Sequence, residues 1–309
     1  MKKAIMNLAI VFLFLLLVSA CGQTNSSESQ NEAPEEKNET ITYESENGPV
    51  EVPANPERVV VLGGFTGNVM ALDANLAGVE SWAKSNPRFI EQLEDVEEVS
   101  DESLEKIIEL EPDLIIGYST TKNIDKLKQI APTVTYTYGA VDYLTQHIEI
   151  GKVLNKEKEA TEWVNDFKER AKVAGDDIRA HIGEEATVSV IENFDKQLYV
   201  FGDNWGRGTE ILYQEMKLKM PEKVKEMALA DGYYALSVEV LDDYVGDYLV
   251  VSKSEETEGS FQETDTYQNM DAVKNNRVFQ ADASEFYFND PITLDYQLEF
   301  FINSFLESE

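Results

Sequence analysis

The stretch NKEKEATEWVNDFKERAKVAGDDIRAHI, residues 155–182, decides the fold class. Its apolar residues recur three or four positions apart, which is the spacing of one face of an α-helix. They are Ala160, Val164, Phe167, Ala171, Ala174, Ile178 and Ile182. About 25 residues at 1.5 Å each give a helix of about 37 Å, long enough to brace two separate lobes. With the helical stretch before it, we expect a linking segment over residues 141–182, broken near Gly151 and Asn155.

On both sides of this segment, short apolar runs alternate with helix-period segments. Expected strands before it are 58–62, 113–118 and 133–138, and expected strands after it are 186–191, 198–201, 248–252 and 278–281. Helices fall between the strands, and a last helix is expected over residues 292–306. Strand–helix–strand units of this length indicate parallel α/β sheets. The predicted fold class is α/β, with two Rossmann-like lobes, residues 43–140 and 183–309, joined by one long α-helix.

A short pattern occurs once in each lobe. Ser103-Leu104-Glu105 is followed ten residues after its serine by Asp113 and a buried strand, and Ser237-Val238-Glu239 is followed at the same distance by Asp247 and another buried strand. Each copy predicts a short helix with a glutamate in its first turn, where the helix dipole favours an acid. The pattern indicates two lobes of similar build, each presenting one carboxylate at an equivalent place.

The first 20 residues have the three parts of an export signal. The start is basic, residues 4–18 are apolar apart from Asn7, and small residues precede Cys21. Cys21 is the only cysteine and stands where bacterial lipoproteins are lipidated, so we favour a lipoprotein signal peptide over residues 1–20 with acylation of Cys21. The alternative is an ordinary cleaved signal with an incidental cysteine. Residues 21–42 are polar and aperiodic, which predicts a flexible tether.

Charge and composition exclude several functions. A net charge of −33 makes nucleic acid and anionic membrane surfaces poor partners, so membrane contact is expected through the lipid anchor only. A single cysteine leaves no internal disulfide. His147 and His181 both fall in the helical stretch, without a partner at catalytic or metal-binding spacing. We therefore expect no enzyme, no metal ligands and no intrinsic cofactor.

The segment Tyr199 to Gly208, YVFGDNWGRG, is the best candidate for a binding loop. Four turn-forming residues surround Trp205 and Arg207 after a strand, and glycine frees the backbone for close approach. Indole and guanidinium together offer a flat apolar face and a planar cation. The alternative is a core tryptophan beside an arginine paired with one of the many acids.

Aromatic residues at other strand ends extend the candidate site: Tyr118, Tyr136, Tyr138 and Phe286-Tyr287-Phe288. Trp82, Lys84 and Arg88 are candidates for an opposite wall.

These features together resemble the substrate-binding lipoproteins of iron–siderophore ABC importers, most of all the ferric hydroxamate-binding lipoproteins of Gram-positive bacteria. The residues that carry the resemblance are the signal with Cys21, Arg58-Val59-Val60, the Glu105 and Glu239 units, Ala131-Pro132-Thr133-Val134, the GDNWGRG loop and Ala272-Val273-Lys274-Asn275. The likeness covers essentially the whole mature chain. It implies the class III architecture, in which one helix joins two α/β lobes and the cargo lies in a cleft between them.

The resemblance also implies roles for individual residues. Trp205 and Arg207 would contact the ferric siderophore, and the other residues lining the site would be Tyr199, Tyr138 and an aromatic at Tyr287 or Phe288. Glu105 and Glu239 would dock on arginines of the permease, and the receptor would act as a monomer. Phe65 and Trp82 match the family's first-lobe wall poorly.

The class of cargo stays open at this point. Siderophore oxygens already saturate ferric iron, so the protein needs flat apolar surface and a hydrogen-bond donor. One clear arginine suits a nearly neutral ferric trihydroxamate better than an anionic triscatecholate. Lys84 and Arg88 keep a catecholate or carboxylate siderophore possible, and haem and cobalamin are the other cargoes considered.

Overall fold

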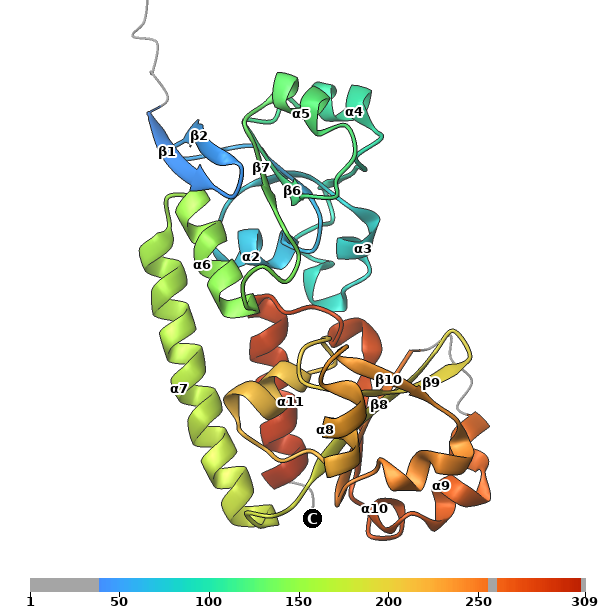
Figure 1. Cartoon of the computed structure of the whole chain (residues 1–309). Helices are drawn as coiled ribbons and strands as arrows, with labels where there is room; N and C mark the ends of the chain where they lie inside the picture. Colours follow the sequence, from blue (N-terminus) through green and yellow to red (C-terminus); the bar gives the residue numbers. More distant parts are fainter. Residues whose placement is uncertain (1–38, 255–259, 307–309) are drawn as a thin grey trace, which may run out of the picture. The chain divides into compact units, whose positions relative to one another are not determined.

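The computed structural model describes residues 39–254 and 260–306 (Figure 1). The predicted signal peptide, Cys21 and the predicted tether up to residue 38 lie outside these residues. The end of the predicted tether needs correction, because Thr40 to Thr42 belong to strand β1 (Thr40–Ser45). This strand pairs antiparallel with β2 (Gly48–Pro53), since backbone hydrogen bonds and the buried Tyr43 and Val52 fix the segment to the first lobe.

The first lobe is built on a five-stranded sheet with the order β5-β4-β3-β6-β7. All neighbouring strands are parallel. The strands are β3 (Val59–Leu62), β4 (Leu76–Val79), β5 (Glu97–Glu98), β6 (Leu114–Tyr118) and β7 (Thr133–Tyr136). The helices are α2 (Thr66–Ala71), α3 (Ser81–Lys84), α4 (Leu104–Glu109), α5 (Ile124–Ile130) and the 3-10 turn η1 (Pro87–Phe89). This arrangement confirms a Rossmann-like first lobe.

Strand β3 shows why this sheet forms. Val59 and Val61 pack into the core cluster on one face, whereas Val60 and Leu62 pack into the cluster on the other. All four side chains are buried, as expected for a parallel strand covered by helices on both faces.

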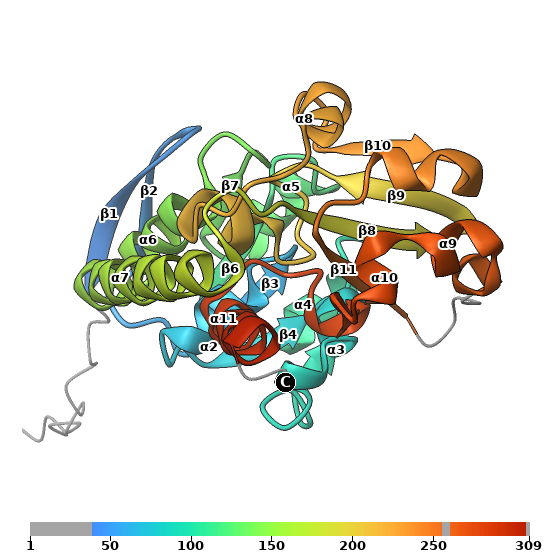
Figure 2. The ribbon, with the colours of Figure 1, turned by 90° about the horizontal axis from the view of Figure 1, so that it is seen from below.

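Two helices form the linking segment. α6 (Tyr143–Val153) ends just before Asn155, whose positive φ of 57° turns the chain into α7 (Glu157–Ile182). Ala160, near the start of α7, belongs to the first lobe's core cluster, and the rest of the same apolar stripe, from Val164 to Ile178, belongs to the second lobe's cluster. One long helix therefore joins both cores, as the sequence predicts. In Figures 1 and 2, α7 runs beside α11 (Pro291–Leu306), against which it packs.

The second lobe corrects the prediction in one respect. Its sheet has the order β10-β9-β8-β11-β12, in which β8, β11 and β12 are parallel but β9 is antiparallel to both of its neighbours. Only Asp195 and Lys196 separate β8 (Val188–Phe194) from β9 (Gln197–Phe201), and both have positive φ. A two-residue turn of this kind can join only antiparallel strands. The lobe is therefore mixed rather than fully Rossmann-like.

The remaining elements of the second lobe follow in chain order. The strands are β10 (Tyr233–Leu236), β11 (Tyr248–Lys253) and β12 (Val278–Asp282). The α-helices are α8 (Glu222–Ala228), α9 (Asp265–Asn269) and α10 (Asp271–Lys274). Tighter or wider helical segments are the π-helix η2 (Glu210–Glu215) and the 3-10 turns η3 (Val238–Asp243), η4 (Ser260–Glu263) and η5 (Ala283–Glu285). Within the described ranges, no helix has both the length and the apolar character required to cross a bilayer.

The repeated sequence pattern is a structural repeat. Glu105 lies in the first turn of α4 and Glu239 in the first turn of η3, and the strands that follow, β6 and β11, hold the same position in their sheets. The aspartate ten residues after each serine has the same role in both lobes. Asp113 accepts hydrogen bonds from the amides of Glu57 and Arg58, just before β3, and Asp247 accepts one from the amide of Thr187, just before β8. The second copy forms a 3-10 turn instead of an α-helix, and its aspartate accepts from one backbone amide instead of two.

Candidate functional site

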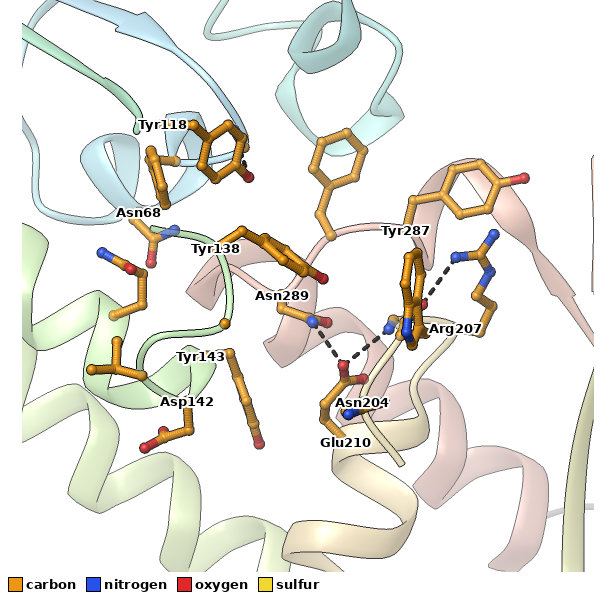
Figure 3. Close-up of a pocket in the computed structure, with 18 of the residues that line it drawn as sticks. Asn68, Tyr118, Tyr138, Asp142, Tyr143, Asn204, Arg207, Glu210, Tyr287 and Asn289 are labelled. Carbon is orange, nitrogen blue, oxygen red and sulfur yellow. Dashed lines mark hydrogen bonds between the residues drawn. The ribbon is translucent and has the colours of Figure 1, made fainter. Parts of the chain in front are cut away.

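A cavity of about 810 Å³ is lined by residues of both lobes and of α6. The first lobe contributes the carboxyl ends of β3, β4 and β6 and the segment after β7, where ligands bind in parallel α/β sheets. The second lobe contributes the loop after β9, part of η2 and the segment before α11. Figure 3 shows these two groups of side chains facing one another.

The first-lobe wall is mainly aromatic. The Tyr118 hydroxyl accepts a hydrogen bond from the Gly64 amide at 3.2 Å, and its ring packs on Phe65 with 4.7 Å between ring centroids. Tyr138 meets Tyr118 edge-on at 6.2 Å and is 68% exposed. Trp82 stacks on Tyr287 of the second lobe at 5.5 Å. Burial raises the pKa of Tyr118, so its hydroxyl is uncharged.

On the second-lobe wall, the loop after β9 has an unusual backbone. Gly206, Arg207 and Gly208 all have positive φ, of 68°, 59° and 77°. Glycine adopts this region freely, but an arginine there is strained, and such strain persists only where the surroundings impose it. Here the Arg207 amide donates to the Phe286 carbonyl at 2.5 Å, and a side chain at Gly208 would overlap the ring of Phe301. The sequence GRG is thus required to turn the loop toward the cavity.

A buried carboxylate fixes the Arg207 side chain. Nε donates to Oε2 of Glu192 at 2.7 Å, and Nη1 donates to the Trp205 carbonyl at 2.9 Å. The Tyr287 hydroxyl donates to the other oxygen of Glu192 at 2.6 Å. The guanidinium lies between the rings of Phe201 and Tyr287, 4.7 and 4.6 Å from their centroids. Because the Glu192 side chain is only 1% exposed, this is a buried ion pair that holds the guanidinium in one orientation at the cavity wall.

Glu210 is a second buried acid in this wall. Its carboxylate accepts hydrogen bonds from the Gly206 amide and the Asn289 side chain, both at 2.9 Å (Figure 3). It also accepts one from the Thr209 hydroxyl at 3.0 Å. Burial raises its pKa, although these hydrogen bonds act in the opposite direction. Glu210 therefore fastens the binding loop to the segment that carries Tyr287 and Phe288.

Five of the six predicted contact residues line this cavity: Trp205, Arg207, Tyr138, Tyr287 and Phe288. Tyr199 is the exception and does not line it. Its ring packs on Tyr233 of the paired strand at 5.8 Å, and Tyr233 packs on Trp205 at 5.1 Å, so Tyr199 supports the tryptophan from behind. Trp205 is 41% exposed, which excludes the alternative of a core tryptophan. The second part of that alternative, an arginine paired with an acid, is confirmed, because Arg207 forms an ion pair with Glu192.

The predicted opposite wall is only partly correct. Trp82 lines the cavity, but Lys84 and Arg88 do not. Arg88 donates through Nε to Glu285 at 2.8 Å and lies over the ring of Tyr296 at 4.0 Å. It therefore connects η1 of the first lobe to η5 and α11 of the second. Tyr136, another candidate at a strand end, is buried in the core.

Neither histidine is placed for chemistry in the cavity. His147 is 1% exposed, its Nδ1 lies 3.0 Å from Asn68 Oδ1, and burial lowers its pKa to about 4. His181 is an exposed residue near the end of α7. Among residues 39–254 and 260–306, no three His, Cys, Asp or Glu side chains are grouped so that they could hold a metal ion.

Comparison with known protein families identifies the family of this chain. The model of the periplasmic binding proteins matches residues 59–285, which includes both lobes and the linking helix. The chain belongs to this family.

Two curated periplasmic binding proteins of Bacillus subtilis are similar along almost the whole chain. The iron(3+)-hydroxamate-binding protein FhuD is 37% identical over 96% of this chain and 97% of its own length. The iron(3+)-hydroxamate-binding protein YxeB is 36% identical over 97% of this chain and 95% of its own length. The solved structure of FhuD2 from Staphylococcus aureus with bound ferrioxamine B matches with a TM-score of 0.77 at 33% identity, covering 82% of this chain and 99% of that one. These findings confirm the resemblance and the two-lobed α/β fold.

Sequence reasoning missed the acids that organise the site. Glu192 lies in β8 but directly follows the expected strand 186–191, where a polar residue is ordinary. Glu210 follows the binding loop and is one acid among 59 Asp and Glu residues. One signal was available for Glu210, because a glutamate four residues after Gly206 can reach back to a free amide at the start of a helix. No such local signal exists for Glu192, whose partners Arg207 and Tyr287 are 15 and 95 residues away in the chain.

Proposed function

We propose that this protein is an extracytoplasmic, lipid-anchored receptor that binds a ferric hydroxamate siderophore in the cavity and delivers it to an ABC permease for iron uptake. The anchor would be Cys21, and the receptor would act as a monomer. The activity is binding and release without turnover. Membership of the periplasmic binding proteins, and relatives named for iron(3+)-hydroxamate binding, support this function.

The arrangement of Arg207 is the observation that carries the proposal. Its guanidinium lines the cavity with a fixed orientation, and Nη2 has no hydrogen-bond partner among the residues that the structure describes. Trp205, Tyr138 and Tyr287 supply flat apolar surface around it. A ferric siderophore presents carboxyl- or hydroxamate-type oxygens at the metal and apolar methylene arms beyond it. A donor surrounded by aromatic rings is complementary to such a complex, and the protein needs no metal ligands of its own.

The charges in the wall favour a hydroxamate over a catecholate. Arg207 is the one Lys or Arg residue among those lining the cavity in the described part of the chain, and Glu192 already neutralises it. Three catecholates leave a ferric complex with several negative charges, whereas three hydroxamates leave it neutral. With Lys84 and Arg88 outside the lining, nothing on the walls offsets an anionic cargo. Haem is disfavoured as well, since neither histidine lines the cavity and burial raises the pKa of Tyr118 and Tyr287, which disfavours the phenolate form that ligates haem iron.

Delivery would use Glu105 and Glu239. Both are exposed, and the structural repeat gives them equivalent places on the two lobes. A hydrogen bond from Ser237 lowers the pKa of the Glu239 carboxyl, which keeps it ionised. Two exposed carboxylates, one on each lobe, are complementary to two arginines on a permease surface.

A fluorescence titration tests the receptor function. Two of the three tryptophans, Trp82 and Trp205, line the cavity, and Trp163 does not. A ferric hydroxamate should quench the full-length protein in detergent saturably at sub-micromolar concentration, and a ferric triscatecholate should not. Quenching by the catecholate alone would redirect the proposal to that cargo. Absence of saturable quenching by every ferric siderophore tested would refute it.

A further inference from the structure

One acid in the cavity wall lacks a partner. Glu80 follows the carboxyl end of β4, lines the cavity and is half-buried. Within residues 39–254 and 260–306, its carboxylate receives no hydrogen bond and forms no ion pair. Its pKa is raised first by burial and then by the negative charge of Asp101. The folded protein thus keeps a partly desolvated carboxylate without compensation, which costs free energy unless something else supplies the partner.

The other acids of the same cavity are accounted for by the fold. Asp142 caps α6, where it accepts hydrogen bonds from the amides of Leu144 and Thr145, both at 3.0 Å. Glu210 ties the binding loop to Asn289. Glu80 has no comparable structural role, so its place in the wall needs another explanation.

The charge balance of the cavity is negative. Arg207, its one cation among the described lining residues, forms an ion pair with Glu192, and that pair has no net charge. Glu80, Asp142 and Glu210 remain as lining acids, in a chain of net charge −33. The field inside the cavity therefore attracts a positive group and repels an anion.

Aromatic residues line the same cavity as Glu80. Trp82, two residues further along the chain, is 50% exposed and lines the same cavity. Tyr118 lines it as well, and the charge of Glu80 is one of the causes that raise the pKa of its hydroxyl. A carboxylate beside aromatic faces is a common environment for ammonium groups, because the rings attract a cation and the acid pairs with it.

We propose that Glu80, with Trp82 and Tyr118, forms a subsite for a primary ammonium group on an arm of the ferric hydroxamate. This inference rests on the proposed function and narrows it to amine-bearing hydroxamate complexes. Three hydroxamate anions balance Fe³⁺, so the iron centre is neutral and can lie against Trp205 and Arg207. An arm ending in an ammonium gives the complex one positive charge, which would compensate Glu80 on binding.

A matched pair of ligands tests the subsite. Ferrioxamine B carries a free ammonium arm, and its N-acetyl derivative has the same iron centre without the charge. Calorimetric titration of the full-length protein in detergent should show that ferrioxamine B binds about tenfold more tightly than the acetyl derivative, the effect of one charge-assisted hydrogen bond. In Glu80→Gln, which keeps the size of the side chain, the ratio should fall to about one, because the charge pair is lost.

The matched control is Glu91→Gln, which removes one exposed acid of the same lobe that does not line the cavity and should keep the wild-type ratio. Using the ratio of two ligands within each variant removes any effect of partial misfolding. Equal affinity of the wild type for both complexes, or an unchanged ratio in Glu80→Gln, would overturn the subsite and leave the receptor function standing. If neither complex binds the wild type, the subsite is overturned, and the receptor function is judged separately by the fluorescence titration with other ferric hydroxamates.

Discussion

The two walls of the cavity are built in different ways. In the second lobe, Arg207 and Glu210 are fixed by hydrogen bonds to Glu192, Asn289 and the backbone. In the first lobe, the wall consists mainly of aromatic rings packed on one another, with Tyr138 more than half exposed. One wall has a defined donor geometry, and the other has adaptable apolar surface. We infer that the second lobe recognises the iron centre and that the first lobe accommodates the variable parts of the cargo.

In the two repeated units outside the cavity, the lobes are alike. Glu105 and Glu239 occupy the same position relative to β6 and β11, and Asp113 and Asp247 fix both units in the same way. The two lobes are similar in the units proposed to contact the permease, and they differ in the walls proposed to contact the cargo. Docking should therefore depend on both lobes equally, and binding should depend on them unequally.

The largest loss of function is expected when the glutamates of both repeated units are removed. Glu105→Ala with Glu239→Ala should abolish siderophore-dependent iron uptake in cells, because both carboxylates are needed to orient the receptor on the permease. The affinity for the cargo should stay unchanged, since neither residue lines the main cavity. Uptake of radioactive iron and a fluorescence titration measure the two effects.

The control for this experiment is Glu109→Ala with Asp242→Ala, which removes one exposed acid from each of the same two helical segments. It should leave uptake intact. Loss of uptake and cargo affinity together in the double glutamate variant would show that the acids are structural.

The next largest effect is expected at the rigid wall. Arg207→Ala should weaken binding of a ferric hydroxamate about 100-fold, since it removes the charged donor from the iron-facing surface. It also leaves Glu192 buried without its cation, which should lower the free energy of unfolding by about 3–5 kcal/mol. Calorimetric titration and denaturant unfolding measure the two losses.

A second variant separates binding from stability. Arg207→Ala with Glu192→Gln removes the uncompensated charge and keeps a partner for Tyr287, so much of the stability should return while affinity stays low. Recovery of affinity together with stability would mean that Arg207 only supports the fold.

A smaller effect is expected for the exposed indole. Trp205→Ala should weaken binding about tenfold through lost ring contact and buried area. Trp163→Phe is the control, because Trp163 stacks on Phe167 away from the cavity and should not affect affinity. An unchanged dissociation constant in Trp205→Ala would move the iron site away from the binding loop.

The fold could be predicted from sequence where local pattern decides it. The α7 stripe and the alternation in β3 follow from spacing alone, because each side chain finds its core by periodicity. The antiparallel β9 was missed, although the two-residue gap at Asp195 and Lys196 contains the signal. At the site, the aromatic residues and Arg207 could be found as anomalies in composition. Glu192 and Glu80 could not, because Glu192 is distinguished by partners far away in the chain and Glu80 by its place in a cavity that distant segments form.

The smallest effect is expected at the adaptable wall. Tyr138→Ala should weaken binding only about threefold, since its ring meets Tyr118 only at an edge and the side-chain freedom that it loses on binding offsets much of the area that it buries. Tyr118→Phe is the companion variant, which keeps the ring and removes the oxygen that accepts from Gly64, and it should change affinity less still. Calorimetric titration with one ferric hydroxamate measures both variants against Trp205→Ala. A loss at Tyr138 equal to the loss at Trp205 would mean that both walls hold the iron centre, and the division of roles between the lobes would have to be abandoned.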